Sequence, residues 1–469
     1  MDDPVSDRAP GAFRENEGAI APSVLRGWRA GPALVALLAL LAAQASCGGG
    51  GGGSSGIASA SSGGGTGGGG AAPPATAAEA WRRLLVDIAP LSSADKEARI
   101  ARFVDTCAAS EEGFPLRDGT RAIFVYRGPL APPVAVAGTF NGWSTTASPL
   151  APVLGTSWLA AEVDLGTRAR HEYKFVSQGR TWSADPLNRK FAYGYFNSVA
   201  NLAGSGASHL EKIPNVHATR LQNDRDILVY LPAGYLDAPA ERYPVLYMQD
   251  GQNVFDPAAP YGGWQVERTA DRLIAQGAIR KLIVVALSNT LRRSYEYTHT
   301  EDCIAPGTLE GGGAADYADF VVNEVKPLID RRYRTLAGRS DTAILGSSFG
   351  GLISLWIGLE YPQVFRNAGG MSTTANWGRF CEQNPRIAEV ATQKGKLDLL
   401  VYIDSGGGLG PSGIDADSYG ANVELRHTLE GLGYSSGTDL LYVWAPGALH
   451  NEAAWRDRVE NPLRFWFHP

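Results

Sequence analysis

The sequence is poor in cysteine and histidine and has no excess of positive charge. Its 469 residues include 4 cysteines and 7 histidines, and the formal net charge is −6. No two cysteines form a CxxC pair, so a structural zinc site is not expected. The acidic balance provides no basic field for nucleic acid. No apolar run reaches the roughly 20 residues of a membrane-spanning helix. These absences leave a globular chain, for which the length predicts two or three domains.

Glycine is the residue in excess, and many of the 57 glycines lie in one N-terminal tract. Two arginines precede an apolar run at residues 32–43, and small residues follow it up to Cys47. This order is typical of a signal peptide, and Cys47 resembles the lipidation cysteine of bacterial lipoproteins. We expect residues 1–47 to be a signal peptide of lipoprotein type and residues 48–76 to be a flexible Gly/Ser-rich linker. The protein is then exported, either as a lipid-tethered cell-envelope lipoprotein or as a freely secreted protein.

Two different periodicities follow the linker. Residues 77–112 have the apolar spacing of two helices separated by Pro90, which predicts a helical hairpin without chemistry of its own. Residues 113–204 instead contain short alternating segments divided by Gly, Pro and Asn. That pattern predicts an all-β, immunoglobulin-like sandwich.

The predicted sandwich resembles the early-set domain of carbohydrate-binding module family 48. The resemblance rests on Ala137-Gly-Thr-Phe-Asn-Gly-Trp143, His171-Glu-Tyr-Lys-Phe175, Trp182, Asp185-Pro186 and Asn197-Ser198. It implies glycan contact through four side chains: Trp143, Lys174, Trp182 and Asn197. The two tryptophans suit this role because flat aromatic faces match the apolar faces of sugar rings. The alternative is a sandwich that has lost sugar binding and only supports the neighbouring domain.

Residues 205–469 alternate apolar runs with helical segments, which predicts an α/β domain. The expected strands are 227–231, 245–248, 282–287, 342–345, 399–403 and 440–444, and the expected helices are 266–275, 316–333, 350–360 and 419–432. Pro327 is expected to kink the second helix. Such alternation indicates a mostly parallel sheet with helices on both faces, in which ligands bind beyond the carboxyl ends of the strands.

A G-x-S-x-G motif is the strongest catalytic signal in this domain. Gly346-Ser-Ser-Phe-Gly350 stands between a predicted strand and a predicted helix. The small residues permit a tight turn that lifts the central hydroxyl into solvent at the N-terminus of the helix. The motif therefore predicts Ser348 as the nucleophile, and the spacing excludes Ser347.

A serine nucleophile needs a base, which follows it in the chain order Ser, Asp or Glu, His of the α/β-hydrolase fold. Three histidines follow Ser348. His427 lies in a predicted helix and His468 is next to the C-terminus, whereas His450 follows the last predicted strand. We therefore predict His450 as the general base.

The acid of the triad should follow the strand at 399–403, where three aspartates are candidates. Asp404 ends that strand before Ser-Gly and could instead cap a turn. Asp417 begins the next predicted helix, where a carboxylate can orient a histidine from across the loop. We favour Asp417 over Asp415, and either over Asp404.

The whole domain resembles the "putative esterase" family of α/β-hydrolases, which includes feruloyl and acetylxylan esterases of carbohydrate esterase family one and enterochelin esterases. The matching segments are Tyr247-Met-Gln-Asp-Gly-Gln-Asn-Val-Phe255, Gly263-Trp264, Arg293-Ser-Tyr-Glu-Tyr297, the serine motif, and His450-Asn-Glu-Ala-Ala-Trp455. The resemblance implies an oxyanion hole formed by the backbone N–H groups of Phe349 and Gln252. The glycine-rich loop at 406–413 is longer than the turn usual in the family. Three aromatic residues are candidate pocket walls, with core packing as the alternative: Trp264, Tyr295 and Trp377.

These patterns together predict an exported serine esterase that works through an acyl-enzyme. The resemblance implies feruloyl or acetyl groups on a polysaccharide as the substrate. An enterochelin-type siderophore esterase is the alternative among enzymes, and a non-catalytic glycan-binding surface lipoprotein is the alternative outside them. We expect no metal, no cofactor and no nucleic-acid partner. In an exported protein Cys303 and Cys381 could form a disulfide, or they could be separate buried thiols.

Overall fold

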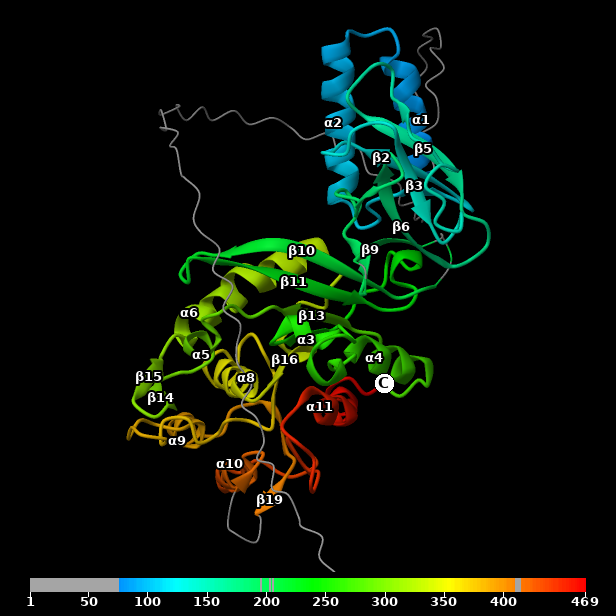
Figure 1. Ribbon diagram of the computed structural model, residues 1–469. Coiled ribbons are helices and arrows are strands. Elements are labelled where there is room, and N and C mark those ends of the chain that lie inside the picture. Colours follow the sequence, from blue (N-terminus) through cyan, green and yellow to red (C-terminus); the bar gives the residue numbers. More distant parts are fainter. Residues whose placement is uncertain (1–75, 195, 202–203, 205, 410–414) are drawn as a thin grey trace, which may run out of the picture. The chain divides into compact units, whose positions relative to one another are not determined.

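The structure is a computed structural model that describes residues 76–194, 196–201, 204, 206–409 and 415–469 (Figure 1). The predicted signal peptide with its lipidation site Cys47 lies outside the described residues, as does the linker up to residue 75. Within the described ranges, no helix is long and apolar enough to cross a membrane.

The predicted helical hairpin is present as α1 (Ala77–Ile88) and α2 (Ser93–Ala109). Both helices begin at a hydroxyl cap, because the side chains of Thr76 and Ser92 each accept a hydrogen bond from a backbone N–H of the first turn. Their apolar faces pack on one sheet of the sandwich, where Trp81 and Ile100 join a buried cluster with Phe114. The hairpin therefore covers a face that would otherwise expose apolar side chains.

The β-sandwich expected from the alternating pattern is also present. One sheet has the order β1 (Leu116–Asp118), β2 (Arg121–Tyr126), β5 (Leu159–Asp164), β4 (Ala151–Pro152). The other contains β3 (Val134–Gly138), β6 (Arg170–Ser177), β9 (Asn197–Asn201) and β8 (Lys190–Ala192), with β7 (Thr181–Ser183) paired to β6. Alternate residues of β2 and β6 face each other across the sandwich, which buries the rings of Phe124, Tyr173 and Phe175.

The second sandwich sheet continues into the sheet of the α/β domain. The strand order there is β21 (Leu440–Trp444), β18 (Leu400–Ser405), β17 (Asn367–Met371), β16 (Thr342–Ser347), β12 (Val245–Met248), β13 (Ile283–Leu287), β11 (Asn223–Leu231), β10 (His209–Ala218). Neighbours from β21 to β13 run parallel, whereas β11 and β10 run antiparallel. Strand β10 then pairs with β8 of the sandwich. The carboxyl ends of the parallel strands meet at one edge, where the predicted catalytic residues lie.

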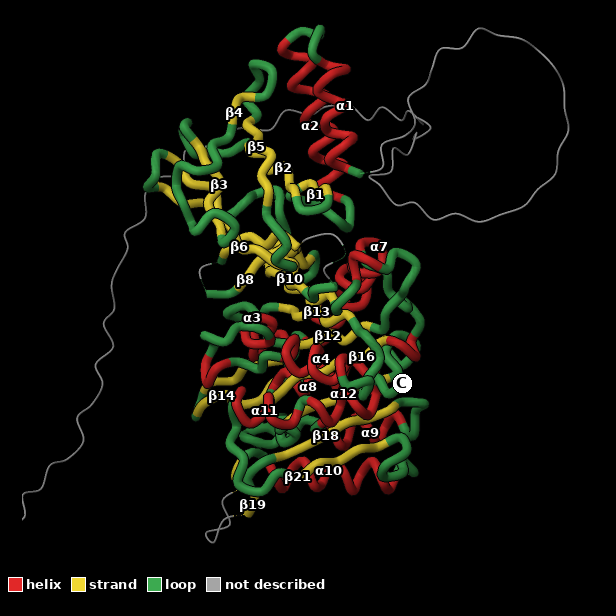
Figure 2. The backbone as a smooth tube through the Cα atoms, turned by 90° about the vertical axis from the view of Figure 1, so that its right-hand side faces the viewer, coloured by secondary structure: helices red, strands yellow, loops and turns green. Residues whose placement is uncertain are grey.

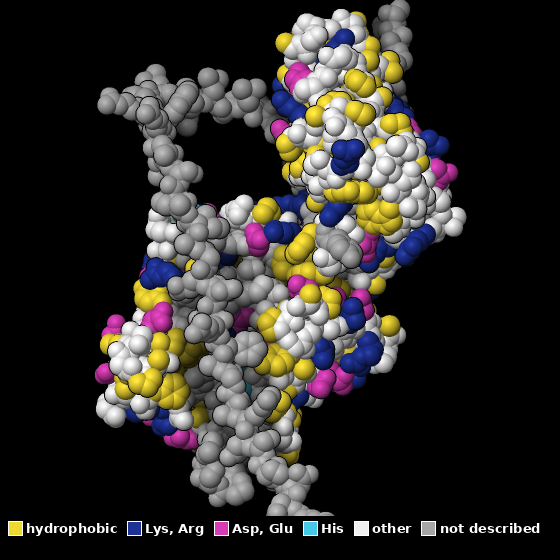
Figure 3. Space-filling model, viewed as in Figure 1, with side chains coloured by type: hydrophobic (Ala, Val, Ile, Leu, Met, Phe, Trp, Pro, Cys, Tyr) yellow, Lys and Arg dark blue, Asp and Glu magenta, His cyan; other side chains and the backbone are white. Residues whose placement is uncertain are grey.

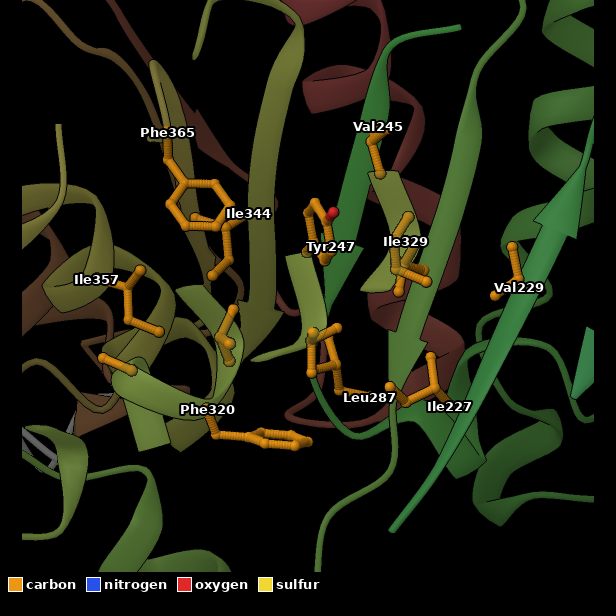
Figure 4. Close-up of a cluster of buried hydrophobic side chains, with 14 of the residues drawn as sticks. Ile227, Val229, Val245, Tyr247, Leu287, Phe320, Ile329, Ile344, Ile357 and Phe365 are labelled. Atoms are coloured by element: carbon orange, nitrogen blue, oxygen red, sulfur yellow. The ribbon is translucent and has the colours of Figure 1, made fainter. Parts of the chain in front are cut away.

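Helices cover both faces of this sheet, which confirms the α/β-hydrolase fold class (Figure 2). One face carries α4 (Val266–Ala275), α11 (Glu452–Arg458) and α12 (Glu460–Trp466). The other carries α6 (Ala314–Asp319), α7 (Lys326–Arg332), α8 (Phe349–Glu360), α9 (Ile387–Lys394) and α10 (Tyr419–Gly431). Successive residues of β12 alternate between the two cores, so Tyr247 packs with Ile344 and Ile357 while Leu246 faces α4 (Figure 4).

Several elements of the α/β domain were not predicted, among them β10, β17, α9, α11 and α12. Strand β17 was not predicted, because its sequence Asn-Ala-Gly-Gly-Met has no continuous apolar run. The predicted kink at Pro327 takes the form of a π-helical segment at Phe320–Val325 between α6 and α7. The backbone N–H of Lys326 bonds the carbonyl of Val321, five residues back, which accommodates the extra residue in the turn before the proline.

Candidate active site

Ser348 occupies a sharp turn between β16 and α8. Its backbone has φ 58° and ψ −124°, a conformation that L residues rarely adopt and that costs about 1–3 kcal/mol. A Cβ atom on Gly346 would lie 2.4 Å from the carbonyl oxygen of Gly350, and one on Gly350 would lie 3.0 Å from a carboxylate oxygen of Asp250. Both glycines of the motif are therefore needed to close the turn. The Oγ of Ser348 lies 3.3 Å from Oγ1 of Thr374.

The predicted base and acid are hydrogen-bonded to each other. His450 Nδ1 lies 2.7 Å from Asp417 Oδ1. The Asp417 side chain is only 2% exposed, whereas that of His450 is 39% exposed. The second carboxylate oxygen of Asp417 accepts hydrogen bonds from Ser372 Oγ at 2.7 Å and from the backbone N–H of Gly406. A carboxylate with both oxygens hydrogen-bonded in this way can hold the His450 imidazole in one orientation. The Nε2 atom of His450 is then available to accept a proton.

Asp404, the alternative acid, is committed to other partners. It is fully buried and receives Arg458 Nε at 3.1 Å, the Tyr402 hydroxyl at 2.8 Å and the backbone N–H of Ser372 at 2.9 Å. Burial raises the pKa of Asp404 above its ordinary value, although the charge of Arg458 opposes the rise. For Asp415 the structure describes only the backbone, in the short strand β20 (Asp415–Ala416). The geometry therefore favours Asp417 among the three candidates.

Ser372 links these groups and was not anticipated from the sequence. It follows β17 with φ 44°. Its Oγ donates to Asp417 and accepts from Trp455 Nε1 at 3.0 Å and from Arg458 Nη2 at 2.9 Å. The indole of Trp455 also packs against the His450 ring at 5.1 Å between centroids. Because β17 was not predicted, the serine that follows it could not be placed beside His450 and Asp417 from the sequence.

The two amides implied as an oxyanion hole begin short helices at the same sheet edge. Phe349 is the first residue of α8 and Gln252 is the second residue of α3 (Gly251–Val254), so neither N–H has a partner within its own helix. The preceding Asp250 has φ 56°. A Cβ atom on Gly251 would lie 2.7 Å from the backbone of Ala286, so only glycine allows α3 to approach β13 this closely.

An ion pair between Asp250 and Arg293 holds the segment that precedes α3 near the turn at Ser348. The Asp250 carboxylate receives Arg293 Nε at 2.7 Å and Nη2 at 2.8 Å, and Asn289 Nδ2 at 2.6 Å. Burial lowers the pKa of Arg293, but the charge of Asp250 outweighs it and raises that pKa above its ordinary value. The guanidinium also lies 5.7 Å from the ring centroid of Phe349. The pair thus fixes both implied oxyanion-hole segments, a role that the 43-residue separation conceals in the sequence.

The three candidate pocket walls have different surroundings. Trp264 is 3% exposed and packs on Trp455 at 5.6 Å, and Trp377 is fully buried against the ring of Phe349 at 4.9 Å. This burial favours the core-packing alternative for both tryptophans. Tyr295 is half-buried beneath the guanidinium of Arg292, 4.3 Å from its ring centroid.

Cys303 and Cys381 form a disulfide, which settles the alternative left open above. The bond joins the hairpin of β14 (Glu301–Ala305) and β15 (Thr308–Gly311) to the loop that follows Trp377. Asp302 reinforces the junction by accepting hydrogen bonds from the backbone N–H groups of Gly378, Phe380 and Cys381. Three apolar side chains of the hairpin and of this loop are exposed: Ile304, Leu309 and Phe380. Figure 3 shows hydrophobic atoms gathered over the hairpin.

The four candidate sugar contacts lie on or beside β6 of the sandwich. The rings of Trp143 and Trp182 are 6.1 Å apart, and Trp182 is 41% exposed. Lys174 lies two residues from Glu172 on the same face of β6. Asn197 is 5% exposed, and its amide donates to Glu172 at 2.9 Å. The structure therefore brings the exposed Trp182, the partly buried Trp143 and two polar side chains to one face, with the Asn197 amide already bonded within the protein.

A model of the "Putative esterase" family matches residues 218–459. Among curated proteins, the chain is 31% identical over 147 residues to an endo-1,4-beta-xylanase/feruloyl esterase of Xylanibacter ruminicola, covering 31% of this chain and 19% of that protein. It is 30% identical over 192 residues to a siderophore triacetylfusarinine C esterase of Aspergillus fumigatus, covering 39% of this chain and 63% of that protein. The chain thus spans less than two thirds of the length of either relative.

Solved structures with similar coordinates include esterases of the same two kinds. A ferulic acid esterase superposes with a TM-score of 0.44 at 19% identity, covering 55% of this chain and 98% of that one. The enterobactin esterase FES of Shigella flexneri superposes with a TM-score of 0.43 at 18% identity, covering 74% of this chain and 93% of that one.

Proposed function

Because the chain belongs to the "putative esterase" family, we propose that it is a serine esterase that hydrolyses carboxylic ester bonds. The hydrogen bond of 2.7 Å between His450 and Asp417 is the observation that carries the proposal. It supports His450 as base and Asp417 as acid, because both follow Ser348 in the chain order typical of α/β-hydrolases.

In this mechanism Ser348 Oγ attacks the ester carbonyl while His450 Nε2 takes its proton. Asp417 holds the imidazole in the tautomer that carries a proton on Nδ1 and stabilises the cation that forms. The backbone N–H groups of Phe349 and Gln252 bind the oxyanion, a contribution of about 3–4 kcal/mol per donor to the barrier. The alcohol leaves with the proton from His450, and water then attacks the acyl-enzyme by the reverse roles.

We infer that the substrate is an acyl group, feruloyl or acetyl, on a polysaccharide. The pair of Trp182, which is exposed, and Trp143, which is partly buried, supports this substrate class, because adjacent aromatic faces suit stacking on sugar rings. The Xylanibacter relative, which is named an endo-1,4-beta-xylanase/feruloyl esterase, is consistent with it. An exported protein, tethered through Cys47 or secreted, would meet such a polymer outside the cell.

A siderophore ester is the second candidate substrate. It is favoured by the Aspergillus relative, which is named a siderophore esterase and covers more of this chain than the xylanase relative does. The two candidates share the triad and differ only in the groups that would hold the alcohol.

The test compares the full chain with Ser348→Ala on p-nitrophenyl acetate, on feruloylated and acetylated xylan fragments, and on a cyclic catecholate siderophore. We expect Ser348-dependent release from the xylan fragments. Release only from the siderophore would move the substrate to the second candidate. If wild type and Ser348→Ala release the same amount from every substrate, the serine mechanism is wrong and a non-catalytic glycan-binding protein becomes the better description.

A further inference from the structure

A cavity of about 460 Å³ lies between the second sandwich sheet and α4. Strands β6, β8, β10 and β11 contribute to its wall, together with the segment from Phe255 to Asp271. Its size falls within the range of about 300–1,000 Å³ that is usual for small-molecule sites. None of the residues proposed for catalysis lines it, so it is distinct from the active site.

One side chain of the wall contains a buried polar atom that has no hydrogen-bond partner among the described residues, Glu267 Oε2. The ring of His209 lies 3.5 Å from Glu211, on the face of β10 opposite to Leu210, which lines the cavity. Burial also raises the pKa of the Glu267 carboxyl to about 7. An unpaired buried polar group costs about 1–3 kcal/mol. The Glu267 side chain is 17% exposed, so its carboxyl group can bond a hydroxyl group of a ligand in the cavity.

Three carboxylates and two guanidinium groups are interleaved along the wall. Arg170 lies 3.6 Å from Glu172, and Arg268 lies 3.7 Å from Glu267. Asp271, the remaining acid, accepts hydrogen bonds from the Tyr230 hydroxyl at 2.6 Å and from Ser208 at 2.7 Å. Among the residues that the structure describes, no group of three potential metal ligands occurs here. The cavity therefore favours neither an anion nor a cation, and its many donors and acceptors suit a neutral polyhydroxylated ligand.

Aromatic rings form the apolar part of the wall. The ring centroids of Phe191 and Tyr193 lie 5.1 Å apart, and Phe255 adds a third ring from the α/β domain. Flat apolar surfaces beside carboxylates and guanidinium groups match the two kinds of surface on a pyranose ring. We propose that this cavity binds one pyranose unit of a glycan.

The cavity is continuous with the face that carries the tryptophan pair. Glu172 lines the cavity and also accepts the Asn197 amide. From Glu172, the same face of β6 continues through Lys174 to Val176, which lies opposite Trp182 in β7. Four residues of strand span about 13 Å, so a short oligosaccharide on the tryptophans can place one sugar in the cavity. The choice of a glycan rests on the polysaccharide substrate of the proposed function, but the binding itself does not require ester hydrolysis.

The test measures binding of xylotriose, cellotriose and maltotriose to the full chain by isothermal titration calorimetry. These sugars carry no ester, so the outcome is independent of catalysis. We expect at least one of them to bind, and Phe191→Ala and Glu267→Gln each to weaken it about tenfold, the effect of losing about 1.4 kcal/mol. Trp182→Ala is the comparison variant: it removes an aromatic ring from the same face outside the cavity, so it tests the contribution of the tryptophan pair separately from that of the cavity. Hydrolysis of p-nitrophenyl acetate checks that each variant is folded.

Three results would overturn the proposal. The first is the absence of binding by all three sugars at concentrations up to about 10 mM, well above the 1 mM dissociation constant of a weak site. The second is loss of binding in Trp182→Ala with no change in Phe191→Ala or Glu267→Gln, which would place the whole site on the tryptophan pair. The third is undiminished binding in all variants. Weaker sugar binding by Phe191→Ala and Glu267→Gln supports the proposal, whatever the effect of Trp182→Ala.

Discussion

At the scale of single residues, two buried aspartates near the same sheet edge have opposite environments. Asp417 uses one oxygen for His450, which is partly exposed, and the other for Ser372. Asp404 instead faces Arg458, which is 5% exposed. An acid that orients a base affects the transition state, whereas an acid that neutralises a buried arginine affects the stability of the fold.

This contrast predicts different consequences for two isosteric variants. Asp417→Asn should lower kcat by at least about a hundredfold with little change in melting temperature, because the imidazole loses the carboxylate that sets its tautomer. Asp404→Asn should lower the melting temperature and leave a measurable kcat in the folded fraction, because breaking a buried ion pair costs about 3–5 kcal/mol. Steady-state kinetics with p-nitrophenyl acetate and calorimetry on both variants distinguish the roles. The reverse pattern would assign the triad acid to Asp404.

The candidate site was predictable where a residue type and a chain position sufficed. The serine motif and the last strand single out Ser348 and His450 by local pattern alone. Position in the sequence already favoured Asp417 among three aspartates, and the partners of Asp417 and Asp404 in the structure add the distinction between them that the sequence lacks. Ser372 and the pair of Asp250 with Arg293 could not be anticipated, since their contacts join segments far apart in the chain.

At the scale of elements, close contact between β17 and its neighbours explains why this strand lacks an apolar run. A Cβ atom on Gly370 would lie 2.1 Å from Thr373 Oγ1, and one on Gly369 would lie 2.7 Å from the indole of Trp466. The glycines allow helices to approach the strand from both faces, so the usual β-branched residues of a buried strand are excluded. Strands that bury large side chains, such as β12 and β13, were predictable for the opposite reason.

The same contact predicts the effect of adding one methyl group. Gly369→Ala should lower the free energy of unfolding by about 1–3 kcal/mol, because the methyl group overpacks against Trp466 and Leu345. Gly431→Ala, at the end of α10, is the matched control. Its added Cβ meets nothing within 4 Å, so it should be neutral or slightly stabilising. Urea unfolding of the two variants measures both, and equal stabilities would contradict the packing argument.

At the scale of the whole molecule, the described part of the chain joins the sandwich to the α/β domain through backbone and charge. Strand β8 pairs with β10, where Glu211 lies opposite Lys190. Glu211 is fully buried and bonds Arg189 at 3.0 Å and the Tyr333 hydroxyl at 2.9 Å. Composition and periodicity predicted both folds, but not this junction, because its charged residues resemble a solvated strand in the sequence.

Glu211→Gln should therefore destabilise the protein without changing the chemistry of the triad. Burial alone would raise the pKa of Glu211, but the neighbouring His209 and Arg189 outweigh it, and the pKa is lowered below its ordinary value of 4.5. A lowered pKa means that the folded state binds fewer protons than the unfolded chain, so the stabilisation is complete above about pH 4.5 and is lost as the pH falls below it.

The melting temperature of Glu211→Gln should be lower than that of the wild type at pH 7, and the difference should shrink below pH 4.5. Tyr333→Phe is the matched control, because it keeps the charge of Glu211 and removes only one hydrogen bond to that carboxylate, at a cost of about 1.5–3 kcal/mol. Its deficit should be smaller than that of Glu211→Gln at pH 7. A difference between wild type and Glu211→Gln that stays constant from pH 7 to pH 3 would show that packing at the junction, rather than the charge of Glu211, holds the two folds together.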